Sequence, residues 1–237
     1  MTAASSRPKV AECRNVLTCS PRSARRAAET APDRIARIAI DGVDGAGKTT
    51  FADELADVVR GLGRPVIRAS VDRFHNPKQV RYAQGRQSPT GFFEDSYNYT
   101  LLKQYLLTPL GPGGSGRYCA AAFDLLSDTA VPFAAQDALP GSILLLDGIF
   151  LHRPELRHCW DASIFLRVDF AVSVARNAIR DGASPDPLAA SNRRYVEGQR
   201  IYLSTCAPEA HATMVVDNND LAAPAIVSPA SRARGAT

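Results

Sequence analysis

Residues 42–50 combine glycines, a lysine and two threonines in a spacing suited to holding phosphate groups. Gly42 and Gly47, followed by Lys48 and Thr49, match the pattern G-x-x-x-x-G-K-[ST]. Glycines allow close backbone approach, so successive N–H groups can face phosphate oxygens. Lys48 adds a positive charge near the β and γ phosphates, and the Thr49 hydroxyl suits Mg²⁺. The stretch therefore predicts a loop that binds a nucleoside triphosphate.

A loop of this kind should lie between a strand and a helix. In residues 34–40, isoleucines recur in a roughly alternating pattern that is typical of a strand. Apolar residues then recur at helical spacing from Phe51 to Leu62. We assign nucleotide binding to the whole loop: Gly42, Val43, Asp44, Gly45, Ala46, Gly47, Lys48, Thr49 and Thr50.

Two further apolar runs end in a carboxylate. Residues 65–71 lead into Asp72, and residues 143–146 lead into Asp147. Ligands of open parallel sheets bind outside the carboxyl ends of the strands, so both carboxylates should lie beside the loop. Asp72 could accept the proton of an attacking hydroxyl, or it could merely cap a turn. Asp147, together with Thr49, is the predicted Mg²⁺ site.

The helix predicted over residues 170–180 carries Arg176 and Arg180 on its polar side, four residues apart. Like charges at that spacing repel each other unless an anion lies between them, and a triphosphate would be such an anion. We therefore predict catalytic roles for Lys48, Asp72, Arg176 and Arg180, with a closing lid over about residues 176–194. Arg193 and Arg194 begin the next helix, where a functional and a solvated role are equally open.

The length of 237 residues suits one α/β domain, expected over residues 34–227. Residues 1–33 and 228–237 are predicted to be disordered, although the Arg-rich start also resembles an organelle transit peptide. The two ends together carry a net charge of +5 and the residues between them −1, which argues against a nucleic-acid-binding face on the domain. No apolar run is long enough to span a membrane, so a cytoplasmic protein is expected, and its oligomeric state, including a homo-oligomer, stays open.

The order of loop, strand-ending Asp72, aromatic insert, strand-ending Asp147 and paired arginines resembles the uridine kinase and phosphoribulokinase family over roughly residues 34–220. The resemblance implies a three-layer P-loop kinase fold with about five parallel strands and a small helical lid. It also implies ATP and Mg²⁺ as cofactors and a small-molecule acceptor, best matched by the 5′-hydroxyl of a nucleoside.

The same resemblance, together with the long polar loop of residues 75–94, predicts which residues bind the acceptor. They are Asp72, Phe74, Tyr82, Phe93, Asp95, Phe123, Asp124, Arg194 and Gln199. One segment departs from the family. Uridine–cytidine kinases have a histidine shortly after the aromatic–aspartate pair, whereas this chain has residues 126–130, LSDTA. Pyrimidine specificity is therefore not implied.

Three alternatives remain open from the sequence. The phosphate-loop residues also resemble those of thymidylate kinases, which makes a nucleoside monophosphate the second choice of acceptor. A GTPase is disfavoured because Asn218-Asn219-Asp220 lacks the lysine of a guanine-reading segment. A regulator that hydrolyses ATP slowly and signals to a partner is the alternative from another functional class.

Overall fold

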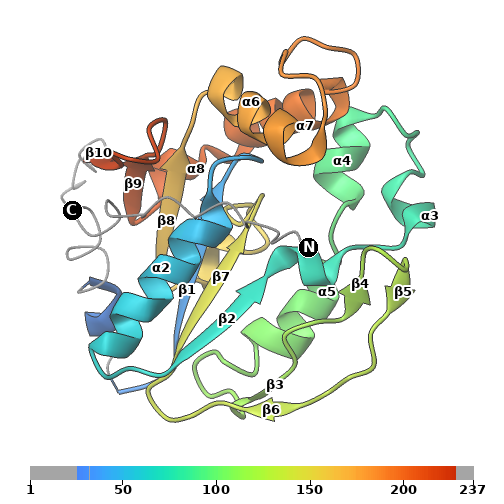
Figure 1. Cartoon of the computed structure of the whole chain (residues 1–237). Helices are drawn as coiled ribbons and strands as arrows, with labels where there is room; N and C mark the ends of the chain where they lie inside the picture. Colours follow the sequence, from blue (N-terminus) through green and yellow to red (C-terminus); the bar gives the residue numbers. More distant parts are fainter. Residues whose placement is uncertain (1–25, 32, 228–237) are drawn as a thin grey trace, which may run out of the picture.

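The computed structural model describes residues 26–31 and 33–227 (Figure 1). At its centre is a six-stranded sheet with the order β10-β9-β8-β1-β7-β2. Five of the strands are parallel to their neighbours, and β10 is antiparallel to β9. The strands are β1 (Ala36–Gly42), β2 (Val66–Ser70), β7 (Ile143–Gly148), β8 (Ala162–Arg167), β9 (Met214–Asp217) and β10 (Ala225–Val227).

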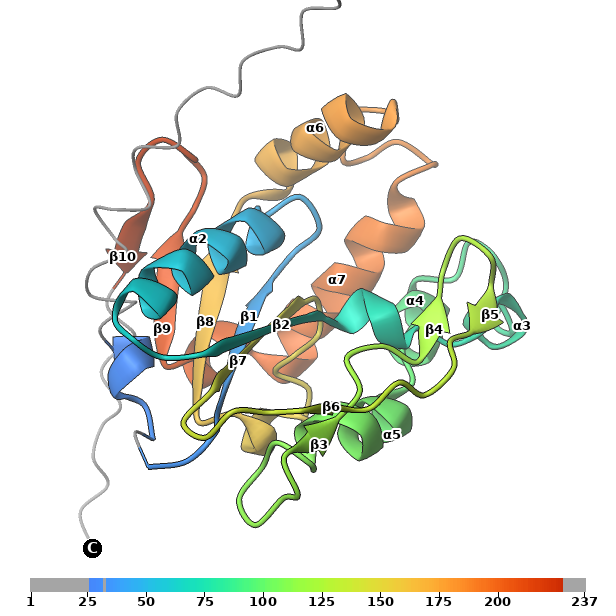
Figure 2. The same ribbon diagram turned by 60° about the horizontal axis from the view of Figure 1, so that its bottom comes forward.

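The central strands are apolar at nearly every position because both faces of the sheet are covered. In β7, Ile143 and Leu145 pack in the core beneath α2, whereas Leu144 and Leu146 pack in the core on the opposite face. Figure 2 shows α2 on one side of the sheet and α5 and α7 on the other. The predicted three-layer α/β fold is therefore confirmed.

The helices are α2 (Lys48–Gly61), α3 (Lys78–Arg81), α4 (Pro89–Asp95), α5 (Tyr99–Leu102), α6 (Phe170–Asp181), α7 (Arg193–Cys206) and α8 (Pro208–His211). A 3₁₀ turn, Val71–Phe74, continues directly from β2, and a π-helical turn, Lys103–Leu107, continues α5. A second 3₁₀ turn, Arg157–Cys159, precedes β8. The loop of residues 182–192 joins α6 to α7 where the lid was expected.

Two small antiparallel ladders form an arm beside the main sheet (Figure 2). β3 (Arg117–Tyr118) pairs with β6 (Gln136–Asp137), and β4 (Phe123–Asp124) pairs with β5 (Thr129–Ala130). The arm thus separates β2 from β7 in sequence, although these two strands are neighbours in the sheet.

Two features go beyond the sequence prediction. The predicted sheet of about five strands gains β10, a three-residue strand too short to give a periodic signal. Within the extension expected over residues 1–33, residues 26–31 lie against the domain: Ala27 is buried, and Arg64 donates to the carbonyls of Ala28 (2.7 Å) and Thr30 (2.8 Å). Other predictions for residues 1–25, 32 and 228–237 lie outside the described residues.

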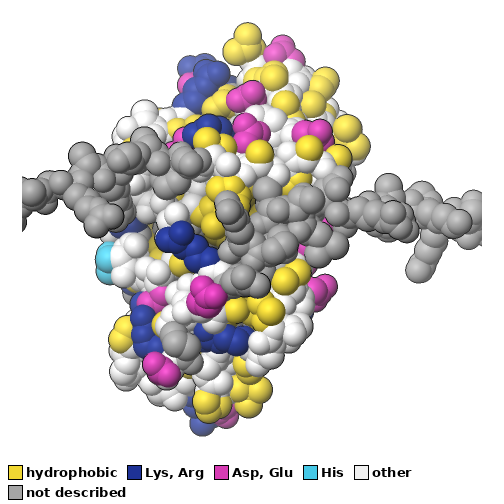
Figure 3. Space-filling model, turned by 90° about the vertical axis from the view of Figure 1, so that its left-hand side faces the viewer, with side chains coloured by type: hydrophobic (Ala, Val, Ile, Leu, Met, Phe, Trp, Pro, Cys, Tyr) yellow, Lys and Arg dark blue, Asp and Glu magenta, His cyan; other side chains and the backbone are white. Residues whose placement is uncertain are grey.

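Within the described part of the chain, every helix is too short or too polar to cross a bilayer. On the face drawn in Figure 3, Lys and Arg side chains lie among acidic and apolar ones. On that face they do not gather into one basic patch.

Candidate active site

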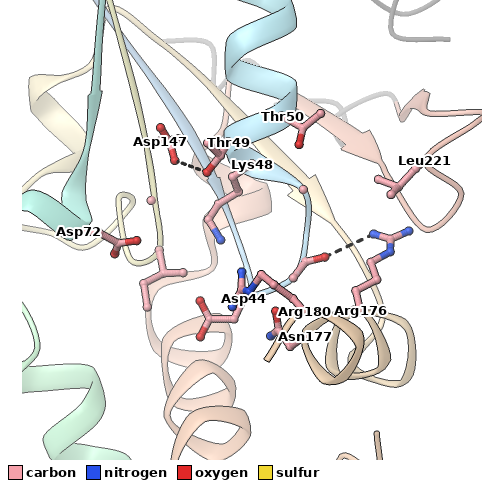
Figure 4. Close-up of a pocket in the computed structure, with 14 residues that line it drawn as sticks. Asp44, Lys48, Thr49, Thr50, Asp72, Asp147, Arg176, Asn177, Arg180 and Leu221 are labelled. Carbon is pink, nitrogen blue, oxygen red and sulfur yellow. Dashed lines mark hydrogen bonds between the residues drawn. The ribbon is translucent and has the colours of Figure 1, made fainter. Parts of the chain in front are cut away.

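A cavity of about 440 Å³ opens at the carboxyl ends of the parallel strands (Figure 4). Its lining combines the phosphate loop, the ends of β2 and β7, helix α6 and the turn after β9. The lining residues are Asp44, Gly45, Gly47, Lys48, Thr49, Thr50, Asp72, Asp147, Gly148, Ile149, Arg176, Asn177, Arg180 and Leu221. The fold therefore brings all four predicted catalytic residues and both predicted metal ligands to one cavity.

The loop has the conformation that its glycines predict. Gly45 and Gly47 have φ angles of 76° and 84°, which favour glycine over residues with a Cβ atom. A Cβ on Gly45 would also lie 2.2 Å from the carbonyl oxygen of Ser173 in α6. Lys48 Nζ donates to the carbonyl of Val43 across the loop (2.8 Å). These contacts leave a compact loop whose backbone follows the wall of the cavity.

The two predicted metal ligands, Thr49 and Asp147, are hydrogen-bonded to each other. Thr49 Oγ1 donates to Asp147 Oδ2 at 2.9 Å, a bond drawn in Figure 4. The other carboxylate oxygen of Asp147 accepts from Arg68 of β2, also at 2.9 Å. Among the described residues, no cluster of three or more His, Cys, Asp or Glu side chains could hold a metal alone. One carboxylate and one hydroxyl suit Mg²⁺, which usually keeps several waters and shares substrate phosphates.

Asp72 lies at the side of the cavity away from α6 (Figure 4) and is exposed to solvent. The buried Tyr97 hydroxyl donates to Asp72 Oδ1 at 2.9 Å. Burial, and then the charge of Asp72, raises the pKa of Tyr97 well above its usual value, so this phenol remains a donor at neutral pH. His75 Nδ1 contacts the Asp72 carbonyl oxygen (2.8 Å). Asp72 is thus held by its neighbours while its carboxylate remains accessible.

Asp44 adds a second carboxylate at the loop. Withdrawal from water raises the pKa of Asp44 above its ordinary value; Lys48 opposes this shift, and the negative charge of Asp72 adds to it. Arg180 also lines the cavity, paired through two bonds of 2.7 Å with Asp181. Acidic and basic groups therefore face each other across the space where phosphates would lie.

Arg176 lies at the other end of the cavity from Asp72, beside Leu221 (Figure 4). Its guanidinium donates to the carbonyls of Asn218 (3.0 Å) and Asn219 (2.7 Å). Leu221 is 54% exposed, although it is a large apolar side chain. This end therefore offers an apolar surface beside a planar cation.

A second cavity of about 280 Å³ lies between α6, the 182–192 loop and α7. It shares Asp44, Asn177 and Arg180 with the first cavity, so the two adjoin. Gln199 lines this second cavity, and its Oε1 accepts from the backbone N–H of Asp44 at 2.6 Å.

The remaining residues expected to bind the acceptor line neither of these two cavities. Phe74 is completely buried in the core opposite α2, and Phe123 is 5% exposed. Phe93 packs against Phe150 and beneath the guanidinium of Arg153. Asp95 accepts from Gln84, and Asp124 accepts from Ser127.

Arg194 and Tyr82 lie together, away from the phosphate loop. The Arg194 guanidinium donates to the carbonyls of Arg81, Gly85, Arg86 and Ser88 at 3.0–3.2 Å. It also lies 4.9 Å from the centre of the Tyr82 ring and is only 4% exposed. These contacts hold the loop between α3 and α4 and give Arg194 a structural role. The acceptor-binding role expected for Arg194 stays a prediction.

Replacing Arg194 by alanine is expected to lower the free energy of unfolding by about 3 kcal/mol, because one buried and three partly buried carbonyls lose a charged donor. Thermal unfolding would measure the loss. Arg193→Ala is the matched control, since Arg193 is the exposed neighbour on the same helix and should change stability little. An Arg194→Ala protein of normal stability with a raised acceptor KM would instead support acceptor binding.

Sequence reasoning did not assign several residues of the site. Arg68, Tyr97 and Asn218 act through partners distant in sequence, and Asn218 Nδ2 donates to the loop carbonyl of Ala46 at 2.7 Å. Leu221 is an isolated leucine in a polar turn. Only Tyr97 had a usable hint, because it lies in the aromatic segment that the family resemblance singled out.

The model of the phosphoribulokinase/uridine kinase family matches residues 37–185. Among curated proteins, none matches the sequence significantly.

Solved structures with a similar fold include one described as a possible uridine kinase from Bacillus stearothermophilus, with a TM-score of 0.67 and 19% identity over 84% of this chain and 98% of the other. Phosphoribulokinase from Rhodobacter spheroides gives a TM-score of 0.52 and 14% identity over 78% of this chain and 70% of the other. D-glycerate 3-kinase from Cryptococcus neoformans gives 0.50 and 11% identity over 79% of this chain and 86% of the other.

These identities show the common fold alone, whereas the family match covers more than half of the chain and includes the phosphate loop, Asp72 and Asp147. The chain therefore belongs to the phosphoribulokinase/uridine kinase family of P-loop kinases.

Proposed function

We propose that this protein transfers the γ-phosphate of MgATP to a hydroxyl group of a small molecule. The observation that carries the proposal is the convergence of Lys48, Asp72 and the Thr49–Asp147 pair on one cavity. A cation near the phosphates, an accessible carboxylate and hydroxyl-plus-carboxylate ligands for Mg²⁺ are the parts that phosphoryl transfer requires. Bound Mg²⁺ would neutralise charge on the phosphate oxygens.

The orientation of the nucleotide follows from the two ends of the cavity. The sequence predicted a catalytic role for Arg176, but in this proposal Arg176 and Leu221 offer a flat, partly apolar surface that suits a base, whereas Asp72 lies at the other end (Figure 4). The γ-phosphate would therefore point toward Asp72, with Lys48 and Arg180 beside it. In this arrangement Asp72 accepts the proton of the attacking hydroxyl, and Tyr97 keeps its carboxylate in place.

For the acceptor we propose a nucleoside that presents its 5′-hydroxyl to Asp72, without a pyrimidine-specific contact. Within residues 126–130, which lack the histidine of uridine–cytidine kinases, Asp128 pairs with Arg81 (3.0 Å) and accepts from the Lys78 backbone N–H. Asp128 therefore ties the tip of the β4–β5 hairpin to α3. Its carboxylate is already engaged by these two contacts.

The test is acceptor-dependent formation of ADP from MgATP. The panel should contain nucleosides, nucleoside monophosphates and, prompted by the structural relatives, D-glycerate and a phosphorylated ribulose. Stimulation by a nucleoside supports the full proposal, and stimulation by a monophosphate supports the thymidylate kinase-like alternative. Slow hydrolysis that no acceptor stimulates would favour an ATP-hydrolysing regulator.

A further inference from the structure

Helix α7 reaches the phosphate loop through two buried polar side chains. Gln199 Oε1 accepts from the Asp44 backbone N–H (2.6 Å), while Gln199 Nε2 donates to the Tyr195 carbonyl (3.0 Å). The Tyr202 hydroxyl donates to Asp41 Oδ2. Gln199 and Tyr202 are 3% and 2% exposed, so water cannot readily replace either contact.

The two contacts fall on different parts of the loop. Gln199 and Tyr202 are three residues apart and therefore project from the same side of α7. Asp41 immediately precedes Gly42, the first glycine of the loop, whereas Asp44 lies in its middle. One helix face thus holds the loop at its start and at its centre.

Asp41 links Tyr202 of α7 to the backbone of the loop. Its Oδ1 accepts from the Gly42 N–H at 2.7 Å, while its Oδ2 accepts from Tyr202 and from His152 Nδ1 at 2.6 Å. Asp41 has no exposed surface. The direction of the Gly42 amide therefore depends on a carboxylate whose orientation Tyr202 and His152 set.

The same network contains Asp41, His152 and Ser163 in a hydrogen-bonded series, with His152 Nε2 2.9 Å from Ser163 Oγ. A hydrolase uses such a series to activate a serine, but that serine must reach its substrate. Ser163 is 4% exposed and accepts from the backbone N–H of Thr213 at 3.2 Å. The series instead connects Asp41 to Ser163 in β8 and, through Ser163, to Thr213, the residue before β9.

We propose that Gln199 and Tyr202 are positioning residues for the nucleotide phosphates: α7 holds the loop in the conformation that binds a triphosphate. This inference rests on the proposed function, because it takes the loop to be the ATP site. Backbone donors bind an anion best when they are oriented before it arrives, so loosening either contact should weaken phosphate binding. Gln199 then serves the phosphate donor and not the acceptor.

The test compares the affinity of Gln199→Leu and Tyr202→Phe for a non-hydrolysable MgATP analogue, measured by calorimetry. Gln199→Leu leaves the partly buried Asp44 amide without its Gln199 partner and should raise Kd about tenfold, and Tyr202→Phe should raise it about fivefold. Thr205→Ala on the exposed side of α7 is the matched control and should leave Kd unchanged. Tyr202→Phe keeps the ring packing, so it remains informative if Gln199→Leu folds poorly.

Two further measurements separate positioning from general loosening. Tripolyphosphate affinity should fall in parallel with that of the ATP analogue, and the Asp44 amide proton should exchange faster in Gln199→Leu. Unchanged Kd, within twofold, in both folded variants overturns the inference. If Lys48→Ala also leaves Kd unchanged, the ATP site itself is wrong; if Lys48→Ala alone raises Kd, only the role of α7 is wrong.

Discussion

Asp72→Asn is expected to lower kcat by about 10²–10⁴-fold while the affinity for MgATP stays near that of the unaltered protein. The amide keeps an oxygen that can accept from the Tyr97 hydroxyl, so the local structure should survive. It cannot take a proton from an attacking hydroxyl. Steady-state rates with the best acceptor of the panel, together with calorimetric binding of MgATP, would measure the two effects separately.

The matched variant for this experiment is Tyr97→Phe, which removes the hydrogen bond to Asp72 but leaves the carboxylate. Because Tyr97 acts through Asp72, its loss should cost kcat about tenfold, less than the loss of the carboxylate itself. If Asp72→Asn retains normal turnover, Asp72 has no role as the base. The 3₁₀ turn after β2 would then have only a structural role.

Lys48→Ala is the second change with a large expected effect. Removing the cation that faces the phosphates should lower kcat by about 10²–10³-fold and weaken triphosphate binding measurably. The Lys48 ammonium contacts the Val43 carbonyl on the loop itself, so its loss should leave the rest of the domain folded. Calorimetry with MgATP and ADP would show whether the loss is greater for the triphosphate.

Lys78→Ala controls for the loss of one positive charge, since the Lys78 side chain is exposed and lies outside both cavities. It should bind MgATP as the unaltered protein does. Equal affinities in Lys48→Ala and Lys78→Ala would count directly against the assignment of residues 42–50 as a nucleotide site.

Local pattern was enough to predict the phosphate loop because its chemistry lies in consecutive residues. Gly45, Gly47 and Lys48 have their roles from the backbone freedom of glycine and the charge of lysine, whatever surrounds them. Asp72 and Asp147 needed one step more. Asp72 follows β2 and Asp147 lies near the end of β7, and parallel strands end at a common edge, so the topology brings them together without knowledge of side-chain packing.

The acceptor residues show where such reasoning stops. The family resemblance assigned Phe74 and Phe123 to the acceptor site, yet both side chains are buried. Arg194 was expected to reach the substrate, and in the structure its guanidinium donates to the backbone that precedes α4. An aromatic ring or a guanidinium can serve a core, a loop or a ligand equally well. Its residue type therefore does not tell which partner it meets.

By itself, the sequence determined the α/β class, the nucleotide loop and the two strand-end carboxylates, because each follows from short-range backbone preferences or from the common direction of parallel strands. Only the tertiary structure decided that Arg68 pairs with Asp147, that Leu221 lines the far end of the cavity and that Gln199 holds the loop. These contacts join segments far apart in the chain. Which side chain meets which partner depends on how helices and turns pack, and no local spacing records it.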